Sequence, residues 1–181
     1  MADITLNNTN LYSDIAKHSI WFPEDQANKV PEVWKPWLLD RGSLTSALTE
    51  FSANHFSVNV LSETEKRPLP WEAEKLGLAV DNEARVREVE LICQEQVMVF
   101  ARSIIPLTML ELDSGTFNKM GNKPLGHLLF KDGRARNRKR SLSRYQHANG
   151  ECVYGRTTPF EYQGGEILVS EFFVNPALIS V

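Results

Sequence analysis

Residues 85–106 read RVREVELICQEQVMVFARSIIP, two runs of alternating side chains separated by a polar segment at positions 94–96. Apolar and β-branched residues recur at every second position of both runs, and this period predicts two strands. The short polar segment between them predicts a tight turn. We therefore expect an antiparallel hairpin, around which the rest of the chain is organised.

The register of this hairpin decides which side chains share a face. With a two-residue turn at positions 95–96, Val89 lies opposite Arg102, and Arg87 lies opposite Ile104. The two arginines then lie on one apolar face as diagonal neighbours, about 7–8 Å apart at the backbone and within reach of one ligand. An odd-length loop or a bulge would break this arrangement.

Two guanidinium groups on an apolar face require anions, because a desolvated charge without a partner costs several kcal/mol. In one interpretation the anions belong to the protein: Arg87 pairs with Glu171, and Arg102 is left over. The run at 166–174 is apolar on both faces, which predicts that Glu171 is buried in a central strand. In the other interpretation the arginines bind a small molecule that carries two carboxylates.

Length and composition predict one ordinary soluble domain over residues 1–181, with 42% hydrophobic residues and a net charge of −3. The apolar runs are too short to span a bilayer and the N-terminus lacks a leader pattern, so we expect a cytoplasmic protein. We also expect a monomer.

Cys93 and Cys152 are predicted to be reduced thiols. The four histidines have no companions at ligand spacing, so we expect no metal site.

Other segments carry weaker patterns. We interpret residues 1–32 as a weakly ordered arm. The remaining patterns predict two short helices within 33–51, a strand at 56–61, a short helix within 68–78, a loop-rich crossover ending in a short helix near 130, and strands at 152–162 and 166–174.

A basic ribbon covers residues 131–145, which hold seven of the 20 Lys and Arg residues and one acidic residue. Such a ribbon suits nucleic acid, a ligand-facing strand or a solvated surface. No recognition helix, zinc motif or ribonucleoprotein aromatic motif accompanies it, so we expect no nucleic-acid partner.

Six short motifs, taken together in their order along the chain, resemble the chorismate lyase family over about residues 33–174. They are WLLDRGSLT at 37–45, VREV at 86–89, VFARSIIP at 99–106, GNKPLG with LF at 121–130, YGR at 154–156 and LVSEFF at 168–173. The resemblance implies an α+β fold, in which helices pack on one antiparallel sheet of about six strands and helical flaps cover a buried ligand.

The resemblance also implies roles for five residues. The family's ring-carboxylate arginine falls on Arg87, its second arginine, beside the enolpyruvyl group, on Arg102, and its phenol-binding glutamate on Glu171. Contacts from the two flaps fall on Leu44 and Leu125. Arg102 and Glu171 would be the catalytic pair. Whether Glu171 accepts a proton or only orients the hydroxyl is open at this point.

The implied activity is elimination of pyruvate from chorismate to give 4-hydroxybenzoate, the first committed step of ubiquinone biosynthesis, without a cofactor and with product inhibition. The alternative is a non-catalytic domain of the same fold that senses a small carboxylate, as in bacterial transcription regulators. Against it, we expect no DNA-binding winged helix in the short polar arm before the domain.

Overall fold

One antiparallel sheet organises the computed structural model, which describes residues 3–112, 115–130, 136–137 and 139–180. Within these residues the sheet has eight strands in the order β1-β6-β7-β8-β4-β3-β2, with β5 paired to β7. The α+β class predicted above is confirmed. The sheet has more strands than the six expected, because it gains the short strands β1 and β5. The strands are β1 (Ile20–Pro23), β2 (Phe56–Lys66), β3 (Ala84–Cys93), β4 (Gln96–Pro106), β5 (Arg136–Asn137), β6 (Ser141–Gln146), β7 (Cys152–Tyr162) and β8 (Gly165–Phe173).

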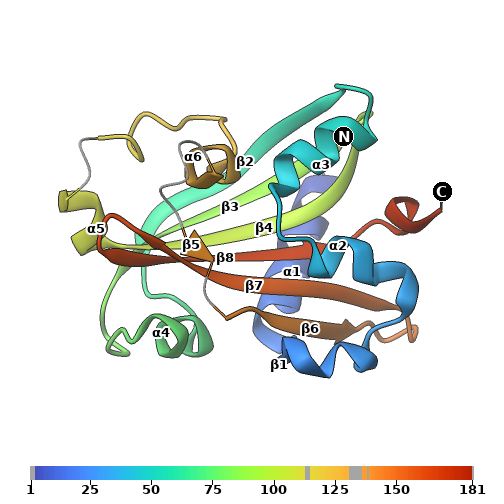
Figure 1. The fold of residues 1–181 in the computed structure, drawn as a ribbon, viewed down its shortest axis with the longest axis horizontal. Helices are drawn as coiled ribbons and strands as arrows, with labels where there is room; N and C mark the ends of the chain where they lie inside the picture. Colours follow the sequence, from blue (N-terminus) through green and yellow to red (C-terminus); the bar gives the residue numbers. More distant parts are fainter. Residues whose placement is uncertain (1–2, 113–114, 131–135, 138, 181) are drawn as a thin grey trace.

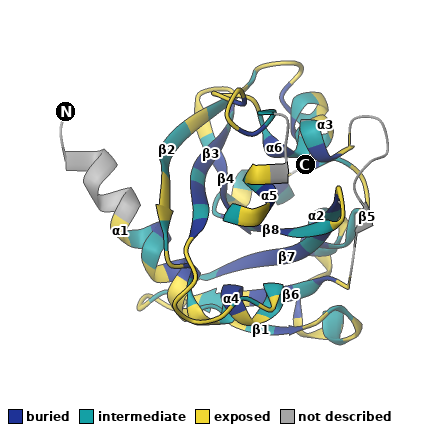
Figure 2. Ribbon diagram, turned by 90° about the vertical axis from the view of Figure 1, so that its left-hand side faces the viewer, coloured by how far each residue is buried: buried dark blue, intermediate teal, exposed yellow. Residues whose placement is uncertain are grey.

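Helices cover both faces of this sheet. Figure 1 shows α3 and α6 in front of the strands and α1, drawn fainter, behind them. The inner strands β3 and β7 are largely buried, whereas the edge strand β2 consists of half-buried and exposed residues (Figure 2). The helices are α1 (Asp3–His18), η1 (Glu24–Lys29), η2 (Glu32–Trp34), α2 (Lys35–Leu39), α3 (Leu44–Phe51), α4 (Pro70–Leu76), α5 (Leu107–Leu112), α6 (Leu125–Phe130) and η4 (Pro176–Ile179).

The hairpin is present, but its register differs from the prediction. The turn residues are Gln94 and Glu95, both with positive φ, and a bulge follows in β4. Arg87 therefore lies opposite Ser103, and Arg102 lies opposite Glu88. A shift of one residue moves a side chain to the other face of a sheet. The prediction that Arg87 and Arg102 share one face is wrong.

The N-terminal segment is also more ordered than predicted. Instead of a weakly ordered arm, it forms α1, followed by β1, which pairs with β6 at the edge of the sheet. Ile15 is fully buried, and the ring of Tyr12 stacks on Phe100 with 4.5 Å between ring centroids. α1 thus covers the face of the sheet that carries Phe100 and Arg102.

The two faces of the sheet have separate cores. The face under α2 and α3 carries the largest cluster, which includes Leu48, Leu91 and Phe173. On the opposite face, one cluster lies under α1 and another lies under α4, where Trp71 packs on buried residues such as Ile104. Among the described residues, no helix is long and apolar enough to cross a membrane.

Candidate active site

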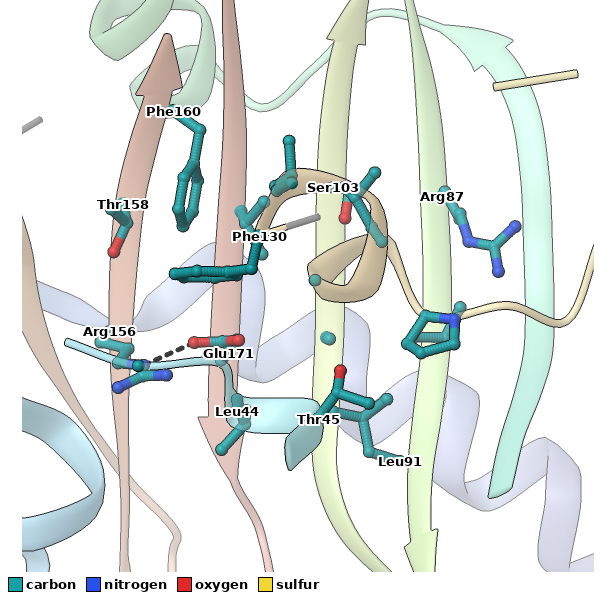
Figure 3. A pocket seen from close by; sticks show the side chains of 18 of the residues that line it. Leu44, Thr45, Arg87, Leu91, Ser103, Phe130, Arg156, Thr158, Phe160 and Glu171 are labelled. Carbon is teal, nitrogen blue, oxygen red and sulfur yellow. Dashed lines mark hydrogen bonds and ion pairs between the residues drawn. The ribbon is translucent and has the colours of Figure 1, made fainter. Parts of the chain in front are cut away.

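A pocket opens on the face of the sheet that α3 and α6 cover. Its floor is formed by side chains of four neighbouring strands, β3, β4, β8 and β7, all pointing to the same side (Figure 3). Arg87 lies at one side of this floor, and Arg156 and Glu171 lie at the other (Figure 3). Apolar side chains such as Val89 and Val169 line the space between them.

Two short helices form the lid of the pocket. Ser43 caps α3 by accepting a hydrogen bond from the N–H of Ser46, and Leu44 of α3 and Leu125 of α6 both line the pocket and are buried. The helices approach closely at Gly126, where an added Cβ would lie 3.1 Å from Oγ1 of Thr45. The lid is therefore closed in this structure, and opening it requires the two helices to separate.

Arg87 is 2% exposed and lines the pocket, as predicted. Its partners differ from the predicted Glu171: Nη1 lies 2.7 Å from Oε2 of Glu63, and Nη2 donates to the carbonyls of Gly121 and Lys123. The two carbonyls belong to the segment that leads into α6. Arg87 thus ties the sheet to one half of the lid.

Arg102, the predicted second arginine of the pocket, lies on the opposite face and does not line it. Its guanidinium donates to both oxygens of Glu72, at 2.6 and 3.0 Å, and to Oε1 of Glu88 at 2.6 Å. Burial favours the neutral guanidine, but the hydrogen bonds and charges of Glu72 and Glu88 outweigh it and raise the pKa of Arg102. Arg102 is a buried ion-pair residue, and the prediction that it contacts a ligand in this pocket is wrong.

Glu171 does point into the pocket, from the central strand β8, with 16% of its side chain exposed. Its partner is Arg156 of β7, with 2.5 Å between Oε2 and Nε. Arg156 also donates through Nη1 to the carbonyls of Trp37 and Asp40, at 2.7 and 3.0 Å. Arg156 therefore fixes both the orientation of Glu171, through the ion pair, and the end of α2, through the two carbonyls.

Arg140, just before β6, brings a third guanidinium to the pocket and is 2% exposed. Its Nε donates to Oγ1 of Thr158 at 3.2 Å and its Nη1 to the carbonyl of Leu38 at 2.8 Å. Burial and the charge of Arg156 lower the pKa of Arg140 to about 10, which still leaves it charged at neutral pH. Residues 131–135 and 138 of the basic ribbon lie outside the described residues.

The pocket therefore combines an apolar interior with a surplus of positive charge. Three arginines, at positions 87, 140 and 156, face two carboxylates, Glu63 and Glu171, that pair with two of them. Such a site suits a small anionic ligand. Among the described residues, no cluster of three or more His, Cys, Asp and Glu side chains could hold a metal ion.

Comparison with known proteins points to one family. The family model described as chorismate lyase matches residues 15–180. A probable chorismate pyruvate-lyase 2 of Pseudomonas entomophila (strain L48) is 37% identical over 165 residues, which cover 87% of this chain and 89% of that protein. A probable chorismate pyruvate-lyase of Methylococcus capsulatus (strain ATCC 33009 / NCIMB 11132 / Bath) is 35% identical, over 80% of this chain and 96% of its own length.

Solved structures resemble the fold at much lower sequence identity. The effector domain of PhnF from Mycobacterium smegmatis has a TM-score of 0.51 at 12% identity, over 75% of this chain and 90% of that one. The possible transcriptional regulator YydK from Bacillus subtilis subsp. subtilis str. 168 also has a TM-score of 0.51 at 12% identity, over 68% of this chain and 60% of that one. At this identity the likeness concerns the fold alone.

Proposed function

The chain belongs to the chorismate lyase family, and from this premise we propose that it eliminates pyruvate from chorismate to give 4-hydroxybenzoate, the first committed step of ubiquinone biosynthesis. The observation that carries the proposal is the arrangement of Arg87 and Glu171 on opposite sides of a closed apolar pocket. A cation and an acceptor at the two ends of a ring suit a ligand with a carboxylate at one end and a hydroxyl at the other.

We infer that Arg87 binds the ring carboxylate of both substrate and product. Its burial at the floor of the pocket supports this role, because a charged hydrogen bond is stronger where water is excluded. Leu44 and Leu125 are the first residues of α3 and α6, whose initial N–H groups have no acceptor within the helix. We propose that these N–H groups donate to the same carboxylate.

Glu171 is proposed to accept a hydrogen bond from the ring hydroxyl. The strand order supports this role, because β3 and β8 are separated by β4 alone. Two interstrand spacings amount to about 10 Å, enough to place a six-membered ring between Arg87 and Glu171. Arg156 then acts as a positioning residue, because it holds the Glu171 carboxylate toward the pocket.

The proposed reaction breaks the bond between ring carbon 3 and the ether oxygen and removes the hydrogen of carbon 4. The ring becomes aromatic, and the hydrogen reaches the methylene carbon of the departing enolpyruvate, which becomes pyruvate. Aromatisation provides the driving force, so we propose no cofactor. The protein's contribution is to hold the enolpyruvyl group in a reactive pose and to stabilise charge on the departing group.

Incubation of the purified protein with chorismate tests this function. We expect 4-hydroxybenzoate and pyruvate in equal amounts, and we expect Glu171→Gln to slow their formation while Glu95→Gln, in the exposed hairpin turn, leaves it unchanged. Binding of 4-hydroxybenzoate without any conversion of chorismate would refute the proposal and favour a sensing domain. If Glu171→Gln retains turnover within about tenfold, Glu171 orients the hydroxyl rather than accepting a proton.

The cytoplasmic location, the monomeric state, the single domain over residues 1–181 and the absence of a nucleic-acid partner stay predictions. Gel filtration and light scattering would test the monomer.

A further inference from the structure

Chorismate has two carboxylates, and the roles proposed above provide for one of them. The second belongs to the enolpyruvyl group, which is attached beside the ring hydroxyl. If Glu171 contacts that hydroxyl, the second carboxylate projects from the half of the ring that lies nearer to Glu171 than to Arg87. The question is which cation of the described structure lies there and is free to bind it.

The order of the strands shows which cations lie near Glu171. Across the floor of the pocket, Arg87 is on β3, Glu171 on β8, Arg156 on β7, and Arg140 directly precedes β6. Neighbouring strands are about 4.8 Å apart. The charges thus follow one another as cation, anion, cation and cation, with Arg140 on the far side of Glu171 from Arg87.

Three of the four candidate cations are already paired with carboxylates. Arg87 pairs with Glu63, Arg156 pairs with Glu171, and Arg102 pairs with Glu72 and Glu88 on the other face of the sheet. The charge of each is thus balanced within the protein, even where a further contact to the ligand is proposed, as for Arg87.

Arg140 differs from them. Among the described residues it has no ion pair with a carboxylate, and its two hydrogen bonds, to Thr158 and to the carbonyl of Leu38, use Nε and Nη1. Nη2 is thus left for a ligand. A guanidinium that is 2% exposed and lines the pocket without an anion is costly unless a ligand supplies one.

We propose that Arg140 binds the carboxylate of the enolpyruvyl group, the role that the family resemblance implied for Arg102. This assignment rests on the proposed function, because it takes chorismate as the substrate. It makes Arg140 a substrate-binding residue that discriminates substrate from product, since 4-hydroxybenzoate has lost this carboxylate. Thr158 and the Leu38 carbonyl hold the guanidinium in place by accepting from Nε and Nη1.

Two aromatic analogues that cannot eliminate pyruvate isolate this contact. One is 3-(carboxymethoxy)-4-hydroxybenzoate, which keeps the ring carboxylate, the hydroxyl and an ether-linked carboxylate. The other is 3-(2-hydroxyethoxy)-4-hydroxybenzoate, in which a neutral hydroxyl replaces the second carboxylate. Calorimetric titration of the wild-type chain should show at least about tenfold tighter binding of the dicarboxylate, the usual gain from a charged hydrogen bond.

The variant Arg140→Gln keeps a donor for the Leu38 carbonyl but removes the charge. We expect it to lose the preference for the dicarboxylate to within about threefold, while the affinity for 4-hydroxybenzoate stays within about twofold of wild type. The matched control is Arg144→Gln, an exposed arginine of β6, which should behave as wild type. Turnover of chorismate by Arg140→Gln should fall about ten- to a hundredfold in kcat/KM.

Several outcomes would overturn the proposal. Equal affinity of the wild-type chain for both analogues, or an unchanged preference in Arg140→Gln, would exclude the contact, and parallel loss of all three ligands would indicate a merely structural role. If circular dichroism shows that Arg140→Gln does not fold, Arg140→Met decides. This variant keeps an apolar stem without the charge, so the preference for the dicarboxylate should again be lost, and an unchanged preference would overturn the proposal.

The binding measurements do not depend on turnover. A chain that discriminates the analogues but does not convert chorismate would refute the proposed function and leave the contact of Arg140 standing. A chain that converts chorismate but shows no role for Arg140 would support the proposed function and refute the contact of Arg140.

Discussion

Arg102 and Glu88 lie opposite each other in the β3–β4 hairpin, with Nη1 and Oε1 2.6 Å apart, on the face of the sheet away from the pocket. Glu72 of α4 completes the cluster, is fully buried and also accepts from the N–H of Leu69 at the start of its helix. The cluster therefore joins α4 to the centre of the sheet. It predicts a role in stability for Arg102, for which the family resemblance implied a catalytic role.

The first prediction is that Arg102→Ala lowers the free energy of unfolding by about 3–5 kcal/mol, because it leaves the carboxylate of Glu72 buried without its cationic partner. Urea unfolding followed by circular dichroism measures this loss. Arg67→Ala is the matched control: Arg67 pairs with Asp81 on the surface, with side chains 65% and 84% exposed, and its removal should change stability little. Folded Arg102→Ala should bind 4-hydroxybenzoate as the wild type does, and a selective loss of that affinity would contradict the assignment.

A second prediction concerns pH and Glu88. Burial would raise the pKa of this carboxyl, but the hydrogen bond from Ser62 and the charges of Arg102 and Lys66 outweigh it, so that the pKa lies below the usual value of 4.5. A depressed pKa in the folded state gives stability that is present above the unfolded pKa and is lost as the pH falls through the folded value. Glu88→Gln should therefore be less stable than wild type near neutral pH, and the difference should shrink below about pH 4.5. A difference that grows in acid would contradict this prediction.

The hairpin illustrates how far the sequence could predict the fold. Alternation of apolar residues identified both strands, and the two short helices expected within 33–51 are present as α2 and α3. The register failed because both turn residues, Gln94 and Glu95, adopt positive φ without the Asn or Gly that usually signals such a turn. The bulge that follows has no sequence signal either, and together the two features decide which face Arg102 occupies.

The functional site, like the fold, was predicted only in part. Arg87 and Glu171 reach the pocket because the alternation in their own strands determines the face on which each lies. Arg156 was quoted in a motif but was given no role, and Arg140 was counted only as part of a basic ribbon. Their placement depends on how β6 pairs with β7 and how β7 pairs with β8, which a single sequence does not reveal. The signal in the sequence that could have pointed to Arg140 was its place directly before the run that forms β6.

The third prediction separates the product-binding arginine from its neighbour on the strand. Arg87→Ala should weaken binding of 4-hydroxybenzoate by about 1.5–3 kcal/mol, because the ring carboxylate loses a charged hydrogen bond. Arg85→Ala should leave the affinity unchanged, since Arg85 bonds to Asn118 and Glu65 and does not line the pocket. Calorimetric titration measures both variants once circular dichroism has shown that they fold. Equal affinities in Arg87→Ala and wild type would return Arg87 to a purely structural role with Glu63.

The fourth prediction is that turnover of chorismate survives EDTA. Aromatisation drives the proposed elimination, and the charges that it develops can be stabilised by arginines alone. The assay compares initial rates before and after dialysis against EDTA, with and without added magnesium. Loss of activity that magnesium restores would show that a metal ion takes part.

The last prediction concerns release of the product. The lid formed by α3 and α6 is closed in this structure: Leu44 and Leu125 are 4% and 7% exposed, and Gly126 lies against Thr45. A bound 4-hydroxybenzoate leaves only when α3 and α6 separate, so we expect release to be slower than chemistry and the product to inhibit turnover. A rapid-mixing experiment should then show a burst of enclosed product followed by a slower steady rate. Gly126→Val, whose bulkier side chain meets Oγ1 of Thr45, should hold the lid partly open, raise the rate of release and weaken product inhibition. A wild-type time course without a burst would mean that chemistry, rather than the lid, limits the rate.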